Sequence, residues 1–350
     1  MANIKNKKHT PMAILIIATV FFITLISVYF WQFLDKHSNS QNYPNEISEL
    51  VNAAKNGDSH AQSNLGQAYE HGKGVAQDYT QAIIWYRKAA EQGFNIAQYN
   101  LGLMYYNGKG ISQSYEKSGE WYRKAAVQGL AVAQYNLGRL YSLGRGVPQS
   151  FVNAEEWYLK SANQGYTHAQ VNIGMLYLHG QGVAQNYPLA KMWFEKAAKD
   201  NDALAMNNLG YIYNYAVGVP QNKRQAVFWY EKAEKAGSCE ARNELSILYF
   251  RGEGGLKHNE IKAMKLLISS AQQGCVEAQN NLGIVYSHST EPLRDYVESY
   301  AWYAVAFANG KLSAEQQQAE ISKKMSVNEL AKANELAHKY VLLYLQKKDF

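Results

Sequence analysis

Three groups of residues in this chain have types and spacings that could do chemistry. Ser114 and Lys117 have the spacing of the S-x-x-K motif, in which the serine is an acyl-transfer nucleophile. Gly-x-Gly pairs such as Gly108 and Gly110 could approach a phosphate closely. Nine histidines and two cysteines are potential metal ligands. Each of these chemistries needs further residues at defined positions.

Ser114 lacks the partners that S-x-x-K catalysis requires, since no S-D-N or K-T-G sequence follows it. Asp78, Ser150 and Asn186 occupy the same position at intervals of 36 residues. All three are residue types that cap helix N-termini with a side-chain oxygen. We therefore interpret Ser114 as a capping residue and predict a protein that is not an enzyme and has no catalytic residues.

The glycines and histidines also lack a ligand-binding pattern. No Gly-x-Gly pair completes G-x-G-x-x-G or G-x-x-x-x-G-K-[ST], so we expect these glycines to end helices. His71, His179 and His288 share one register in predicted loops, but at about 10 Å per helical repeat they should lie on the order of 30 Å apart. No single metal ion bridges that distance, and the sequence predicts neither a metal site nor a cofactor.

Cys239 and Cys275 are the only cysteines, too few for a disulfide framework and without the spacing of a metal motif. One disulfide would need Cα atoms within about 7 Å. Stacked helices separate equivalent positions by about 10 Å. A bridge is therefore the less favoured alternative, and it stays open if the domain lies in an oxidising compartment.

Charge is concentrated near the start of the chain. The net charge is +6, and Lys5, Lys7 and Lys8 precede an apolar segment with no acid beside them. After residue 34 the chain is nearly neutral, with basic residues scattered among acidic ones. A phosphate-binding surface would need clustered Lys and Arg, so the sequence predicts no nucleic-acid partner.

Residues 12–34 form an uncharged apolar segment of 23 residues, long enough to cross a hydrocarbon core of about 30 Å as a helix. The lysines before it and Asp35 after it predict cytoplasmic residues 1–11 and an exported remainder. We expect a single-pass anchor in the inner membrane, a linker over residues 35–44 and a periplasmic domain. The alternative is a cleaved signal peptide and a secreted protein, although the apolar run is longer than the usual 7–15 residues or so and no A-x-A follows.

The remaining chain repeats itself. An alanine opens each of seven units, with spacings of 36 residues and one of 37; the series is Ala61, Ala97, Ala133, Ala169, Ala205, Ala241 and Ala278. Leu or Ile follows four residues later, then Gly in all units except the sixth, which has Ser246, and Tyr stands eight residues after every alanine. This spacing predicts a helix with one apolar face, and the glycine predicts close approach of another helix.

A second helix completes each unit. It follows a capping Asp, Ser or Asn, typically reads A-x-x-W-Y-x-K-A-A and usually ends at a glycine. The sixth unit has Leu266 in place of the tryptophan. One such hairpin leaves its apolar faces exposed, and stacking buries them. We predict an all-α, right-handed α-solenoid of about seven helical hairpins over residues 61–310, with a capping helix at 45–60 and capping helices at 311–350. Ser313 and Ser326 should open the last two helices, with capping-box partners at Gln316 and Glu329.

This pattern over residues 45–350 resembles the Sel-one-like repeat (SLR) family, which belongs to the tetratricopeptide-type (TPR-like) helical solenoids. The resemblance implies a non-catalytic adaptor that binds other proteins, as many bacterial members do in the cell envelope or in contact with host cells. Cysteine-rich members described as penicillin-binding carry a disulfide in each repeat, a pattern that this chain lacks.

By analogy with that family, positions two, six and nine residues after the opening alanine face a concave groove. An asparagine ladder three residues after the alanine could bond a peptide backbone there. The predicted partner-binding groove comprises Tyr99, Asn100, Leu103, Tyr106, Tyr135, Asn136, Arg139, Met175, Leu178, Tyr211 and Phe250. The alternatives are packing within the superhelix for the variable positions and structural hydrogen bonds for the asparagines.

The sequence thus favours a membrane-anchored interaction scaffold of the bacterial cell envelope, whose partner is an unidentified envelope or host protein or peptide. A secreted virulence factor that binds host proteins is the first alternative. A peptidoglycan- or β-lactam-processing protein is the second, and it would need a nucleophile or acid–base constellation that the sequence does not display.

Overall fold

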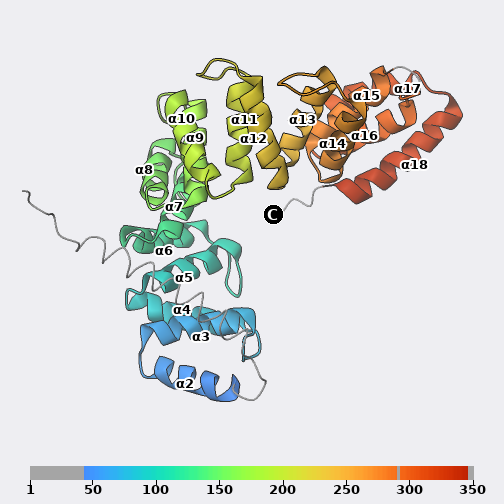
Figure 1. Ribbon diagram of the computed structural model, residues 1–350. Helices are drawn as coiled ribbons and strands as arrows, with labels where there is room; N and C mark the ends of the chain where they lie inside the picture. Colours follow the sequence, from blue (N-terminus) through green and yellow to red (C-terminus); the bar gives the residue numbers. More distant parts are fainter. Residues whose placement is uncertain (1–42, 290–291, 346–350) are drawn as a thin grey trace, which may run out of the picture. The chain divides into compact units, whose positions relative to one another are not determined.

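The computed structural model of the protein describes residues 43–289 and 292–345. The predicted membrane anchor at 12–34 lies outside these residues. None of the helices in the described part is long and apolar enough to cross a membrane. The described residues form an all-α helical repeat solenoid of 17 helices, α2 to α18 (Figure 1).

The chain divides into two compact units, and the first ends at residue 125. Its described helices pack as consecutive pairs after a single leading helix. They are α2 (Tyr43–Lys55), α3 (Ser59–His71), α4 (Tyr79–Glu91), α5 (Asn95–Asn107) and α6 (Tyr115–Val127), the last of which continues across the boundary.

The second unit starts at residue 126 and holds five further helical pairs and two terminal helices. The pairs are α7 (Ala131–Leu143) with α8 (Phe151–Ala162), α9 (Thr167–His179) with α10 (Tyr187–Ala198), α11 (Ala203–Asn214) with α12 (Lys223–Lys235), α13 (Cys239–Arg251) with α14 (Glu260–Gln272), and α15 (Val276–His288) with α16 (Tyr296–Ala308). The terminal helices are α17 (Ser313–Ser322) and α18 (Val327–Tyr344), and both pack on α16.

The predicted capping residues start the second helix of every repeat. Asp78 accepts hydrogen bonds from Thr80 N and Gln81 N, and Ser114 Oγ accepts one from Lys117 N at 3.2 Å. The same bond to a backbone N–H recurs at Ser150, Asn186, Asn222, Asn259 and Asp295. The capping interpretation of Ser114 is therefore confirmed.

Two non-glycine residues take over glycine positions in the repeat. Asn201 stands where other repeats end their second helix with glycine, and its φ is 57°. Ala216 stands where Gly72, Gly108 and Gly144 end the first helix, and its φ is also 57°. Asparagine tolerates this left-handed conformation, whereas in alanine the Cβ atom crowds the following carbonyl. α11 correspondingly ends at Asn214, earlier in its repeat than the other first helices.

The mid-helix glycines explain how the two helices of a repeat approach each other. A Cβ atom added to Gly138 would lie 2.7 Å from Cδ1 of Tyr158, whose ring is buried on α8. The same contact joins Gly66 to Tyr86 and Gly174 to Phe194. The predicted packing reason for the glycine is confirmed, and its partner is the aromatic residue that follows the repeated tryptophan position.

Adjacent repeats are joined by buried glutamines that the sequence analysis did not single out. Gln98 Nε2 donates to Ala90 O at 3.1 Å in the first unit, and Gln134 Nε2 donates to Ala126 O at 3.0 Å in the second. Equivalent bonds are made by Gln62, Gln170 and Gln279. Each glutamine ties the start of one repeat to the second helix of the repeat before it.

The end of the chain follows the prediction in part. Ser326 and Glu329 form the expected capping box at the start of α18. Ser313 is wrong as a cap, because Leu312 holds that position in α17 and no side chain bonds the helix end. α18 covers the last repeat by placing Tyr344 in a stack on Trp302, with ring centroids 5.4 Å apart.

Candidate partner-binding surface

The predicted groove residues of the first unit lie half-buried on α5. Tyr99 stacks on Tyr122 of α6 with ring centroids 5.7 Å apart, and Tyr106 packs edge-on against Tyr115 at 5.1 Å. Leu103, which lies between these two tyrosines in the sequence, is also half-buried. The aromatic rings therefore pack against the partner helix, which agrees with the packing alternative, while Asn100 is half-buried as well.

The predicted groove residues on α7, in the second unit, also pack against neighbouring side chains or bond to their own helix. Tyr135 lies among the rings of Tyr158 and Tyr166, at centroid distances of 5.9 and 5.1 Å. The Arg139 guanidinium lies over the Tyr135 ring at 5.8 Å. Asn136 Nδ2 donates to Val132 O of its own helix at 3.0 Å, so this member of the asparagine ladder has the structural role.

On α9 the structure corrects one prediction. Leu178 is buried in a core cluster together with Phe194, so its side chain does not face a groove. The register places it nine residues after the opening alanine, and α10 packs over that position in this repeat. Met175 is partly buried against the same cluster.

Tyr211 and Phe250 are the most exposed of the predicted groove residues, with exposed fractions of 43% and 54%. Tyr211 on α11 packs against Tyr215, with ring centroids 4.9 Å apart. Phe250 on α13 borders a cavity of about 620 Å³. Of the whole predicted set, Phe250 alone is among the residues that line this cavity.

Three helices of the sixth and seventh repeats enclose the cavity. Most of the lining is apolar, and Arg251, Glu260 and His288 supply titratable groups. The lining residues are Ser246, Ile247, Phe250 and Arg251 from α13, Glu260, Ala263, Met264 and Leu267 from α14, Asn281, Ile284, Val285 and His288 from α15, and Ser289 and Leu293 after α15.

The cavity arises where the sixth repeat departs from the others. Leu267 stands where other repeats have the Tyr or Phe that covers the mid-helix glycine, and Ser246 stands where they have that glycine. Leu267 is smaller than a tyrosine and Ser246 is larger than a glycine, so this pair differs from the others in shape, and both residues line the cavity. The Ser246 Oγ donates to Asn243 O at 2.7 Å. The sequence signal for the site was therefore the irregular repeat rather than the variable positions alone.

Burial and hydrogen bonding both act on the Glu244 carboxyl, which lies beside this region. Glu244 takes the place of the asparagine in the ladder, and Tyr215 Oη donates to its Oε2 at 3.0 Å. Burial raises the pKa of the Glu244 carboxyl, and the Tyr215 hydrogen bond acts in the opposite direction. Burial and the neighbouring Glu244 raise the pKa of Tyr215 to about 12.

The Ser246 and His288 side chains of the cavity both contact groups of their own helices. Ser246 Oγ is engaged with a carbonyl of its own helix, and His288 Nδ1 lies 2.7 Å from Ser287 Oγ and 3.1 Å from Ile284 O. His71, His179 and His288 are the last residues of their helices rather than loop residues. An apolar cavity with a few polar groups is the usual form of a ligand-binding site, and the cavity in the second unit has this form.

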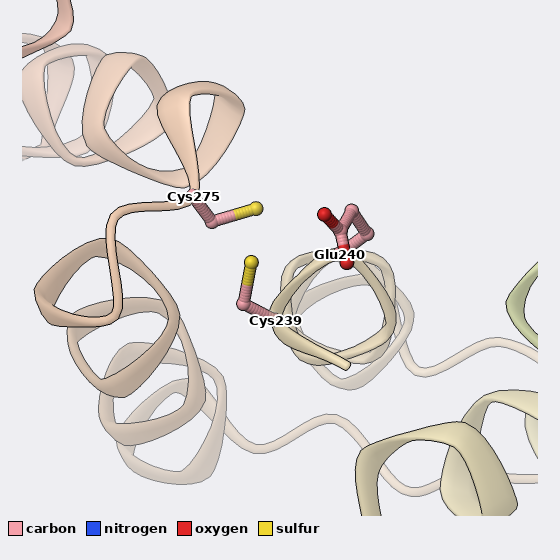
Figure 2. A group of neighbouring side chains, drawn as sticks. All are labelled: Cys239, Glu240 and Cys275. Atoms are coloured by element: carbon pink, nitrogen blue, oxygen red, sulfur yellow. The ribbon is translucent and has the colours of Figure 1, made fainter. Parts of the chain in front are cut away.

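The two cysteines lie closer together than the sequence analysis expected. The sulfur atoms of Cys239 and Cys275 and a carboxylate oxygen of Glu240 all lie within 4.8 Å of one another, and both thiols are free (Figure 2). Because both thiols are free, the structure shows no disulfide between them; what does not hold is the assumption that the two cysteines occupy equivalent positions. Cys239 is the first residue of α13, whereas Cys275 precedes the first residue of α15.

The stacked helical pairs define the class of this protein, which is a helical-repeat scaffold. A family profile described as Sel1 repeat matches residues 59–94, 95–130, 131–166, 167–202, 203–238, 239–275 and 276–311. The chain belongs to the Sel1 repeat family, and this membership indicates a protein–protein interaction scaffold. No curated protein matches the chain.

One solved structure shows the same fold. The chain is similar to a Sel1 repeat protein from Oxalobacter formigenes, with 34% identity and a TM-score of 0.60, over 68% of this chain and 93% of that one. It is also similar to c5321, a protective antigen present in uropathogenic Escherichia coli strains that displays an SLR fold. That match has 26% identity and a TM-score of 0.34, over 90% of this chain and 91% of the other.

Proposed function

We propose that the chain is a membrane-anchored, non-catalytic adaptor that captures a peptide segment of another cell-envelope protein in the cavity between α13, α14 and α15. The single observation that carries this proposal is the cavity of about 620 Å³ at the sixth repeat. Its volume is in the range of pockets that hold small ligands or several side chains.

The lining indicates what kind of segment would bind. Phe250, Ile284 and Val285 offer an apolar surface, while Arg251 and Glu260 offer one charge of each sign. An amphipathic segment with apolar anchor side chains suits such a surface, because burial of apolar area supplies the affinity and a few polar contacts supply the orientation.

The anchoring part of the proposal rests on the sequence. Residues 12–34 carry no charge and follow three lysines, which supports a cytoplasmic N-terminus and a periplasmic solenoid. Secretion after cleavage remains the competing assignment. The mass of the mature chain in membrane and secreted fractions separates the two, because cleavage removes the apolar segment.

The absence of catalysis is part of the same proposal. It is supported by the engagement of Ser246 and His288 with groups of their own helix. The full chain, purified in a mild detergent, should leave labelled peptidoglycan and a chromogenic β-lactam unchanged. Turnover of either substrate would contradict the proposal.

Site-specific photo-crosslinking in the native host tests the cavity. A photoreactive phenylalanine analogue at position 250 should give a discrete crosslinked product with one envelope protein, identified by mass spectrometry. Phe228 on α12 is the matched control, since it is also an exposed phenylalanine, at 46% exposure, and does not line the cavity. The same product from both positions, or none from position 250, would contradict the assignment of the cavity.

A further inference from the structure

Two thiols and one carboxylate converge at the junction between the sixth and seventh repeats, away from the cavity lining (Figure 2). We propose that Cys239, Glu240 and Cys275 bind one thiophilic divalent cation of the zinc class. This site is independent of the proposed peptide capture.

The separations suit a shared cation. The three donor atoms lie within 4.8 Å of one another, and Figure 2 shows both sulfur atoms pointing into the space between the two chain segments. With Zn–S bonds of about 2.3 Å, two sulfurs of a tetrahedral site lie a little under 4 Å apart. Small side-chain rotations therefore bring all three donors to bonding distance, without movement of the backbone.

Hydrogen bonds hold the segments that carry these donors. Ser238 Oγ donates to Glu240 Oε2 at 2.9 Å, which fixes the carboxylate beside the start of α13. Ser270 Oγ donates to Cys239 O at 2.6 Å, which ties the first residue of α13 to α14. Bonds of this kind orient ligands before the metal binds.

The local electrostatics favour anionic ligands with a cation between them. Cys239 and Glu240 lie in the first turn of α13, and Cys275 lies directly before α15, where helix N–H groups stabilise negative charge.

The acids near Glu240 have their own basic partners. Glu234 pairs with Arg242, and Glu277 pairs with Lys311. Within the described chain, no ion pair joins Glu240 to a lysine or arginine. Glu240 therefore contributes a negative charge that a cation would balance.

Packing of the repeat does not require sulfur at these places. The register of Cys275 holds Phe94, Leu130 or Asp202 in other repeats, and the register of Cys239 holds Asn95 or Ala131. The two thiols occur only at this junction, where their offset by one residue turns them toward each other.

The binding step balances as an exchange of protons for a metal ion. Cys239 and Cys275 lose their thiol protons to solvent, two metal–sulfur bonds form, and the ionised Glu240 carboxylate supplies an oxygen ligand. Water completes the coordination. The bound ion would join α13 to α15 at the ends opposite their cavity-lining residues, so that it fixes the spacing of two walls of the cavity.

Cobalt binding tests the proposal, because tetrahedral cobalt thiolates absorb visibly whereas zinc is silent. The full chain in mild detergent, reduced with a phosphine and freed of metal, is titrated with Co²⁺. We expect one ion per chain, sulfur-to-metal charge-transfer absorption in the near ultraviolet, tetrahedral bands in the visible, and displacement by Zn²⁺. Bound Zn²⁺ should also raise the melting temperature, and above the Kd the rise should grow with the logarithm of the Zn²⁺ concentration.

Variants separate ligation from folding. Cys239→Ser and Cys275→Ser should each abolish the charge-transfer band, and Glu240→Gln should weaken Co²⁺ binding by about tenfold or more. Glu277→Gln is the matched control, since Glu277 occupies the register of Glu240 one repeat later and is paired with Lys311. Circular dichroism confirms that each variant keeps its helices, and Glu240→Gln alone suffices if the serine variants do not fold.

Three outcomes would overturn the proposal. The first is the absence of a thiolate band in the folded, reduced wild type at one equivalent of Co²⁺. The second is equal weakening by Glu240→Gln and Glu277→Gln. The third is a chain from native cells that contains no metal and lacks both thiol hydrogens, which would show that the pair is a disulfide instead.

Discussion

The third repeat, residues 131–166, packs the Tyr158 ring against Gly138, whereas the sixth repeat, residues 239–275, packs Leu267 beside Ser246. Both repeats lie in the second unit and have the same pair of helices. The third fills the space between its helices, and the sixth leaves a cavity. In an array whose copies bury the same residues, an irregular copy can present a different surface without loss of the stacking around it.

The largest expected effect on stability comes from truncating the side chain that packs between the two helices of each repeat, which is Tyr158 in the third repeat and Leu267 in the sixth. Tyr158→Ala should lower the free energy of unfolding by about 3–5 kcal/mol, because the buried ring leaves a void. Leu267→Ala should cost less, about 2 kcal/mol, since part of its surroundings is already open. Urea unfolding followed by circular dichroism measures both. Equal losses would mean that the two repeats are equally packed.

Tyr158→Phe is the control for the hydroxyl group, which lies 3.2 Å from Ser142 Oγ. It keeps the ring on Gly138 and should cost about 1 kcal/mol. A loss as large as that of Tyr158→Ala would assign the stability to the hydrogen bond instead of the ring.

Exchanging glycine and serine at the mid-helix position should affect stability differently in the two repeats, at Gly138 in the third and at Ser246 in the sixth. Gly138→Ser places a Cβ atom 2.7 Å from the Tyr158 ring and should cost about 1–3 kcal/mol through overpacking. Ser246→Gly should be tolerated, and together with Leu267→Tyr it should restore the regular packing. The double variant should then be more stable than the sum of the single changes predicts, by about 1 kcal/mol in the urea titration.

A smaller gain is expected at the irregular helix end of the fifth repeat. Ala216→Gly relieves a left-handed alanine with φ of 57° and should raise the free energy of unfolding by about 1 kcal/mol. Gly180→Ala, at the same register of the fourth repeat, should lower it by a similar amount. Thermal melts of the two variants would contradict this account if both shifted in the same direction.

The smallest effect concerns the pH dependence of stability at Glu244. Its pKa is raised by burial, so the folded state favours the neutral acid. The stabilising contribution is complete below the unfolded pKa and is lost as the pH rises through the folded pKa. Glu244→Gln keeps an oxygen for the Tyr215 hydrogen bond and avoids the buried charge. Its stability relative to wild type should therefore increase from acidic to neutral pH in urea titrations, and a constant difference would contradict the burial effect.

The sequence by itself determined the repeat and its helices. Alanine, leucine and tyrosine at spacings of four predict a helical face, and capping residues such as Ser114 and Asp78 locate the start of the second helix. These signals are local, because they depend on residues within one or two turns of each other. For the same reason the mid-helix glycine, present in all repeats except the sixth, could be assigned to close packing before its partner ring was known.

Only the tertiary structure decided which side chains join the repeats and which line a site. Gln134 rather than Asn136 bonds to the preceding repeat, and Leu178 belongs to the core. The cavity beside Phe250 is lined by side chains of three helices, and the meeting of the two thiols depends on a one-residue offset between stacked repeats. Contacts of this kind join residues 8 to 36 positions apart in the sequence, and periodicity along one helix carries no information about the volume or direction of a side chain on the next.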